Sequence, residues 1–211
     1  MKKLTAFIFL LAMTLSASAQ TQWEKPTEEE TQRYALYERK KEIPAKYMQG
    51  GVPEVDGKVT WTKTYKVEGK SAEDIYNNAL GYFSGLVKSG NQTDKSALAG
   101  VNRAEHKILV RAQEWLTFAK KALYLDQTKM NYAVSVECSD GECKVLITNI
   151  SYRYEEGRPS EMHYTAEDMI ADKVAFNKKG NGFTKGGTKK FRMATIDRME
   201  QILNDLGTAL K

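Results

Sequence analysis

The chain has 211 residues, of which 41% are hydrophobic and 28% are charged. These proportions exclude an intrinsically disordered protein and a protein embedded in a membrane, and the length suits one domain with an extension. The formal net charge of +5 is too small to indicate nucleic-acid binding, so we predict no nucleic-acid partner.

The first 19 residues have the three parts of a secretory signal peptide. Lys2 and Lys3 give a positive start, residues 4–15 are apolar, and residues 16–19 are small. We predict cleavage between Ala19 and Gln20, and a periplasmic or secreted mature protein. The apolar run is shorter than the roughly 20 residues of a membrane-spanning helix, so we do not expect the mature chain to span a membrane. Gln20 stands where a lipoprotein would carry a cysteine.

Residues 20–57 are predicted to form a helical extension followed by a linker. Thr27 and Glu30 have the spacing of a capping box, which predicts a helix from Thr27 to about Lys41. Residues 50–53 read Gly-Gly-Val-Pro, a composition typical of a linker. We therefore place the single folded domain at residues 58–211.

Residues 59–67 alternate between apolar and polar side chains, which predicts a strand with one buried face. The buried face carries Val59, Trp61, Tyr65 and Val67, and the solvent face carries Thr60, Thr62 and Thr64. Ser71 then caps a helix, because apolar residues recur at helical spacing after it. These residues are Ile75, Tyr76, Ala79, Leu80, Phe83, Leu86 and Val87.

The middle of the chain is predicted to be rich in strands. Residues 88–104 have the composition of a loop. Residues 107–112 are predicted to form a second strand, and residues 114–125 a third strand whose register the sequence does not determine. Residues 132–150 contain two alternating runs joined around Asp140-Gly141, a pair that tolerates the positive φ of a tight hairpin turn. Pairing about that turn places Val136 opposite Val145 and Glu137 opposite Lys144.

The same register places Cys138 opposite Cys143, in a pair whose Cα atoms lie about 4.5 Å apart. Two cysteines in an exported protein favour a disulfide bond, with two buried free thiols as the alternative. The chain has only two histidines, His106 and His163, in addition to these cysteines, so the sequence does not indicate a zinc site. We predict no metal and no cofactor.

The C-terminal part is predicted to be helical. Thr165 caps a short helix, and a final helix starts at about Thr195. Its apolar stripe consists of Ile196, Met199, Ile202, Leu203, Leu206 and Leu210. The order of elements predicts an α+β fold, a two-layer sandwich in which helices cover one face of an antiparallel sheet.

Basic residues and glycines gather near the start of this final helix. The candidates for an anion-binding site are Lys178, Lys179, Lys185, Lys189, Lys190 and Arg192. Exposed amides beside lysines suit phosphate and sulfate groups. The alternative is a solvated connector between two elements.

Other candidate residues have simpler explanations. His106 is in phase with Ile108 at the start of a strand, which favours a structural role, and His163 has no evident partner. Trp23, Trp61 and Trp115 are candidates for a sugar-binding platform, although Trp61 lies on the predicted core face. We find no catalytic constellation in the sequence.

Several ordered motifs resemble a family of exported bacterial domains of unknown function. They are residues 52–58, residues 69–76, residues 138–141, residues 164–170 and residues 190–197, and the resemblance spans roughly residues 43–205. It implies a TBP-like fold of the order β-α-β(3-4)-α, in agreement with the elements above. The family has no established activity, so no catalytic residue is carried over.

We therefore hypothesise a non-catalytic binding or interaction module of the bacterial cell envelope. Its partner would be an envelope protein or the anionic group of a glycan or a lipid headgroup. The binding surface would be the sheet face bearing Thr60, Thr62 and Thr64, or the segment of residues 178–192, which we call the lysine-rich segment. The alternative is a periplasmic hydrolase whose site is assembled from residues distant in the sequence.

Overall fold

The structure of the protein is a computed structural model that describes residue 28 and residues 42–122, 124–184 and 187–211. The chain divides into two units, Met1–Glu42 and Ile43–Lys211, and the folded domain is the second of these. The predicted signal peptide, nearly all of the predicted helix after Thr27, and Lys185 lie outside the described residues.

The domain contains one large antiparallel sheet and two long helices. The strands are β1 (Glu54–Val55), β2 (Lys58–Val59), β3 (Trp61–Lys66), β4 (Ala97–Asn102), β5 (Lys107–Lys121), β6 (Tyr124–Ser139), β7 (Glu142–Tyr154) and β8 (Met162–Thr165). The helices are η1 (Ala45–Tyr47), α2 (Ala72–Leu86), α3 (Ala166–Met169), α4 (Asp172–Ala175) and α5 (Thr188–Ala209). The large sheet has the order β3-β7-β6-β5-β4, with β8 added at the far end of β7, and β1 and β2 form a separate hairpin.

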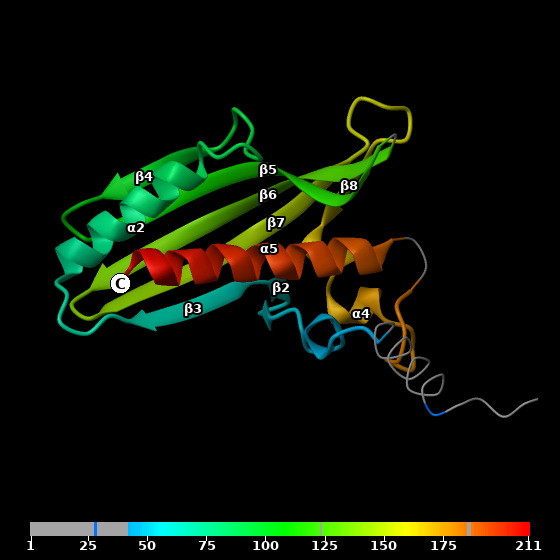
Figure 1. The fold of residues 1–211 in the computed structure, drawn as a ribbon, viewed down its shortest axis with the longest axis horizontal. Coiled ribbons are helices and arrows are strands. Elements are labelled where there is room, and N and C mark those ends of the chain that lie inside the picture. Colours follow the sequence, from blue (N-terminus) through cyan, green and yellow to red (C-terminus); the bar gives the residue numbers. More distant parts are fainter. Residues whose placement is uncertain (1–27, 29–41, 123, 185–186) are drawn as a thin grey trace, which may run out of the picture. The chain divides into compact units, whose positions relative to one another are not determined.

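Helices α2 and α5 lie on the same face of the large sheet (Figure 1). The sandwich is therefore two-layered, and the predicted α+β class is confirmed. The core fills the space between the layers, with Ile108, Val134 and Val145 on the sheet and Phe83 and Ile202 on the helices. No helix in the described residues is long and apolar enough to cross a membrane.

Helix α2 follows its sequence pattern closely. The Ser71 hydroxyl accepts a hydrogen bond from the Asp74 amide, which satisfies one free N–H of the first turn. The predicted apolar stripe faces the sheet, and Ile75, Ala79 and Phe83 are fully buried.

The structure differs from the sequence prediction at three elements that contain buried polar residues or few apolar ones. Residues 107–121 form one strand rather than two, because buried Gln113 and Glu114 interrupt its alternation. Strand β4 lies in the predicted loop and is a short, half-exposed edge strand. Helix α5 begins at Thr188 rather than near Thr195, because buried Thr188 and Arg192 obscure its apolar stripe.

Thr60 does not lie on a solvated face, as the alternation predicted. The residue is 6% exposed, its amide donates to the carbonyl of Pro53, and its Oγ1 lies 3.4 Å from Oγ1 of Thr148. The chain passes from β2 into β3 at this residue, which breaks the alternation. Thr62 and Thr64 are exposed as predicted.

The β6–β7 hairpin has the predicted register near its turn. Val136 pairs with Val145, Glu137 with Lys144, and Cys138 with Cys143. The two sulfur atoms lie 3.7 Å apart, well beyond the roughly 2.05 Å of a disulfide bond, and both cysteines are free thiols. The predicted pairing is confirmed, but the bond itself is not shown.

Candidate functional site

The candidates for an anion site are not brought together in space. Lys178 and Lys179 line a cavity of about 470 Å³ beside α4, together with Gln49 and Asp172. Lys189 and Lys190 line a different cavity of about 640 Å³, between α5 and the end of β5. The lysine-rich segment is therefore divided between two surfaces.

Arg192 does not belong to a surface site. Its side chain is fully buried and donates to the carbonyl oxygens of Tyr47 (2.8 Å), Met48 (2.6 Å) and Ile170 (2.5 Å). It also pairs with Asp172 at 2.7 Å. Because every donor group is directed at the protein itself, Arg192 ties α5 to residues 47–48 and 170–172 and is not available to a dissolved anion.

Lys190 is likewise committed to internal partners. Its ammonium lies 2.8 Å from the Asp126 carboxylate and donates to the Tyr154 hydroxyl at 2.9 Å. The rings of Phe118, Tyr154 and Phe191 surround it, at 4.9, 4.4 and 5.8 Å from the nitrogen to the ring centres. Burial of Asp126 raises its pKa, but the hydrogen bonds from Lys190 and Tyr154 outweigh this and hold the pKa below its ordinary value of 3.8.

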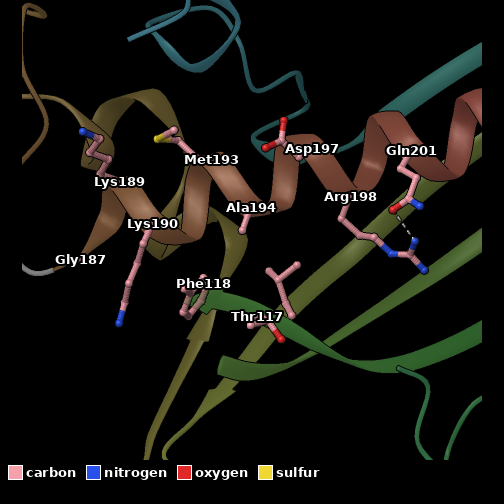
Figure 2. Close-up of a pocket in the computed structure, with 11 residues that line it drawn as sticks. Thr117, Phe118, Gly187, Lys189, Lys190, Met193, Ala194, Asp197, Arg198 and Gln201 are labelled. Carbon is pink, nitrogen blue, oxygen red and sulfur yellow. Dashed lines mark hydrogen bonds between the residues drawn. The ribbon is translucent and has the colours of Figure 1, made fainter. Parts of the chain in front are cut away.

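The cavity beside these residues is a groove with an apolar floor. Figure 2 shows α5 crossing the end of β5, with Ala194 above Thr117 and Phe118, and Lys190 extending beside Phe118. Leu116 and Met193 complete the apolar lining. Asp197, on its rim, is neutralised by Lys46 at 2.6 Å.

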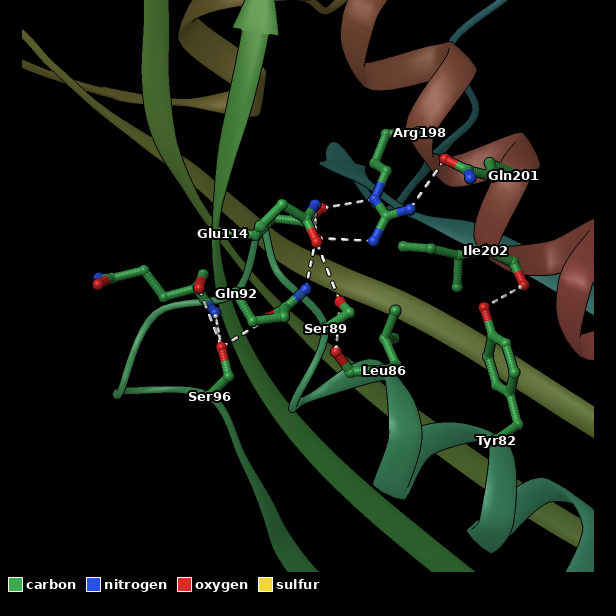
Figure 3. A network of polar contacts seen from close by, with 11 residues as sticks. Tyr82, Leu86, Ser89, Gln92, Ser96, Glu114, Arg198, Gln201 and Ile202 are labelled. Atoms are coloured by element: carbon green, nitrogen blue, oxygen red, sulfur yellow. Dashed lines mark hydrogen bonds and ion pairs between the residues drawn. The ribbon is translucent and has the colours of Figure 1, made fainter.

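A buried polar network lies further along α5, as Figure 3 shows. Glu114 is fully buried and accepts two hydrogen bonds from Arg198, each of 2.8 Å. The side-chain amides of Asn91 and Gln92 donate to the same carboxylate. All of these bonds join β5, α5 and the loop before β4, so the network holds the fold together. Sequence reasoning missed it, although a glutamate inside an alternating strand is a signal for a buried pair.

The opposite face of the sheet carries a second polar arrangement. Gln113, Asn131, Ser151 and Thr165 are neighbours on β5, β6, β7 and β8. Gln113 donates to Asn131 at 2.8 Å, Asn131 donates to Ser151 at 3.3 Å, and the Thr93 hydroxyl donates to Gln113 at 2.9 Å. We call the row Thr93–Gln113–Asn131–Ser151–Thr165 the polar row.

The polar row opens into a cavity of about 490 Å³, lined also by Lys95, Arg153 and His163. The next row of the sheet carries Trp115, Lys129, Arg153 and His163. Trp115 is 37% exposed, and the Lys129 ammonium lies 5.1 Å from its ring centre. This face therefore combines hydrogen-bonding groups, an exposed aromatic ring and basic side chains.

The remaining candidates have structural or local roles. His106 packs edge-on against Tyr76, with 5.8 Å between ring centres. His163 has a partner that the sequence did not reveal, since its Nε2 lies 2.7 Å from Glu161. Trp61 is buried, whereas Trp115 is exposed. Within the described residues no group of three or more potential ligands could hold a metal ion.

An antiparallel sheet with α2 and α5 on one face and an open second face defines a TBP-like domain. The family model "Domain of unknown function (DUF4468) with TBP-like fold" matches residues 61–153. The crystal structure of a DUF4468 family protein from Bacteroides ovatus ATCC 8483 is 32% identical, with a TM-score of 0.72 over 80% of this chain and 95% of that one. The chain belongs to the DUF4468 family.

A TBP-like protein from Parabacteroides distasonis ATCC 8503 shares the fold at 22% identity, with a TM-score of 0.57 over 75% of this chain and 96% of that one. No curated protein matches the chain. The TBP-like fold and the family resemblance predicted from the motifs are thus confirmed. Since the family is one of unknown function, a function has to be argued from the residues.

The buried pair Glu114–Arg198 generates the first prediction. Glu114→Gln and Arg198→Met should each lower the free energy of unfolding by about 3–5 kcal/mol, because each leaves a buried partner uncompensated. The double variant should lose clearly less than the sum of the two. Urea unfolding of the four proteins measures this, with exposed Glu73→Gln as the control. Additive losses would show that the two residues stabilise the fold independently.

The contacts of Asp126 with Lys190 and Tyr154 should make the stability of the fold depend on pH. Because the folded pKa of Asp126 lies below 3.8, its stabilising effect is complete above about pH 5 and is lost as the pH falls through the folded value. Asp126→Asn should therefore cost most stability near pH 6 and little at the most acidic pH at which the protein still folds. Urea unfolding across that range measures the difference, and exposed Glu68→Gln is the control. A cost that does not change with pH contradicts the assignment.

Proposed function

We propose that this protein is a non-catalytic binding module of the cell envelope that holds an anionic glycan on the open face of its sheet. The polar row supports this proposal most directly. Its amide and hydroxyl groups cross four neighbouring strands and open into a cavity of about 490 Å³ rather than into the core.

The chemistry of the row suits a sugar chain. Side-chain amides and hydroxyls both donate and accept hydrogen bonds, as the hydroxyl groups of a sugar do. Trp115 offers an exposed ring for an apolar sugar face, and Lys95 offers charge for a carboxylate or sulfate. Arg153 pairs with Glu156 at 3.0 Å through one nitrogen, and its guanidinium has further donor groups for a ligand. The proposal thus places the ligand on the open face and not on the lysine-rich segment, part of which is already paired.

Binding accounts for the lining better than hydrolysis does. Glycoside hydrolysis usually requires two carboxyl groups that flank the bond to be cleaved. Asp168 is the carboxylate among the residues that line the cavity, and its oxygen accepts the Thr165 hydroxyl at 2.7 Å within a helix cap. The lining therefore offers hydrogen-bond partners for a ligand rather than a pair of catalytic acids.

A location in the envelope is supported by residues 1–19, which have the pattern of a signal peptide. It is also supported by the paired cysteines, since disulfide bonds form readily in an oxidising compartment. Cys138 and Cys143 are direct partners across the hairpin, with their sulfur atoms 3.7 Å apart, and the proposal requires an oxidant to join them.

Glycan binding is tested with oligogalacturonate and a neutral galacto-oligosaccharide of the same length, by calorimetric titration at low salt. We expect binding of the anionic chain, and about tenfold weaker binding for Asn131→Ala and for Arg153→Ala, which corresponds to about 1.4 kcal/mol. Thr208→Ala, exposed on α5 on the helix-covered side of the sheet, is the control and should bind like the wild type. Equal affinity for the neutral oligosaccharide, or full affinity of both variants, contradicts the proposal.

Export and disulfide formation are tested together by the intact mass of the protein recovered from envelope fractions without reductant. We expect a chain that starts at Gln20 and lacks two hydrogen atoms relative to the sum of its residues, because the two thiols have been oxidised. Cys143→Ser should restore the mass expected without the bond. A full-length chain that still begins at Met1, or two thiols open to alkylation after denaturation, contradicts the assignment.

A further inference from the structure

Strand β5 has a free edge over its last part. Strand β4 pairs with β5 only between Lys107 and Arg111. Beyond that, the amide of Thr93 donates to the Gln113 carbonyl and the amide of Trp115 donates to the Asn91 carbonyl, both at 2.8 Å. After Trp115 no described strand or loop pairs with this side of β5.

The bonds at Gln113 and Trp115 show which backbone groups point outward. In an antiparallel strand alternate residues direct their N–H and C=O groups to the same side. Thr117 is two residues beyond Trp115 and still pairs in regular register with Gln127, just before a bulge between Thr117 and Ala119, so its N–H points to the free edge, away from β6. Thr117 is also exposed, and it lies on the rim of the groove under α5 (Figure 2).

The groove and the edge are complementary to an extended peptide. An incoming strand can hydrogen-bond to the edge while its alternate side chains enter a neighbouring pocket. Here that pocket is the groove of about 640 Å³, whose floor is Leu116, Phe118, Met193 and Ala194. Apolar side chains of the peptide would therefore face the floor.

The charge near the edge selects the partner. Lys120, further along β5 and opposite Leu125, is exposed on the side of the strand away from α5 and forms no ion pair with any described residue. In an alternating peptide, the side chains that do not enter the groove lie on this side. Two copies of this edge would bring their Lys120 side chains to one interface, which disfavours self-association. Acidic residues of a different chain would meet Lys120 with opposite charge.

We propose that the edge of β5 at Thr117, together with the groove under α5, binds an extended peptide of alternating acidic and apolar residues by strand addition. This interaction lies on the helix-covered side and the edge of the sheet. The polar row lies on the open face, so the peptide and the glycan are different ligands whose binding is measured separately.

The probe is a fluorescent decapeptide of alternating Glu and Val, compared by anisotropy with a decapeptide of alternating Lys and Val. We expect binding of the acidic peptide and weaker binding as salt is added, because surface charges are screened. Thr117→Pro removes the outward N–H but no bond to β6, and should weaken binding about tenfold. Lys120→Glu should weaken it similarly, whereas Lys178→Glu, in the other cavity, should not.

A second probe leaves the protein unchanged, in case Thr117→Pro disturbs the fold. The acidic peptide is methylated on alternate backbone nitrogens, in one of two patterns, so that each form keeps N–H groups on only one of its two edges. The form whose methyl groups face β5 cannot make the backbone hydrogen bonds to that strand, and it should bind at least about tenfold more weakly than the other form. No binding of the acidic peptide, equal binding of the basic peptide, or equal binding of both methylated forms overturns the proposal. Amide exchange protection confined to residues around Thr117 supports it.

Discussion

The buried pair between Glu114 and Arg198 is the interaction on which both faces of the sheet depend. Removing two charges from water costs several kcal/mol per ion, so the pair is tolerated only with its full set of hydrogen bonds. Asn91 and Gln92 complete that set and thereby fix the loop before β4 against β5. The same loop places Thr93 on Gln113 at the end of the polar row. It also ends the pairing along β5 at Trp115, beyond which the edge is free.

Local signals predicted those parts of the fold in which neighbouring residues decide the structure. The Asp140-Gly141 turn fixes the pairing of Val136 with Val145, and Ser71 fixes the start of α2, as the structure confirms. Apart from the half-exposed edge strand β4, the errors occur where a polar residue is buried by partners distant in the sequence. Arg192 looks like a surface charge because its acceptors, Tyr47 and Ile170, come from other parts of the chain. No periodicity can indicate such a contact.

The polar row was not predictable for a related reason. Its members come from five segments, and they align only when every register between the strands is known. Extending the register of the hairpin turn would pair Asn131 with Ile150. Instead a bulge between Asn131 and Ala133, with Asn149 at a φ of 55°, shifts the pairing so that Asn131 meets Ser151. One extra residue thus keeps Ile150 in the core and continues the polar row on the open face.

The fold indicates where a ligand can lie, whereas the residues indicate which ligand it is. Neighbouring members of the polar row stand one strand spacing apart, about 4.8 Å. A ligand that follows the row must present polar groups repeatedly along its length, as a polysaccharide does and a single phosphate does not. Because the row itself is uncharged, the basic residues Lys95 and Arg153 at its margin would select among such chains by their acidic groups. Salt should therefore weaken the preference for anionic chains more than it weakens the binding of sugar hydroxyls.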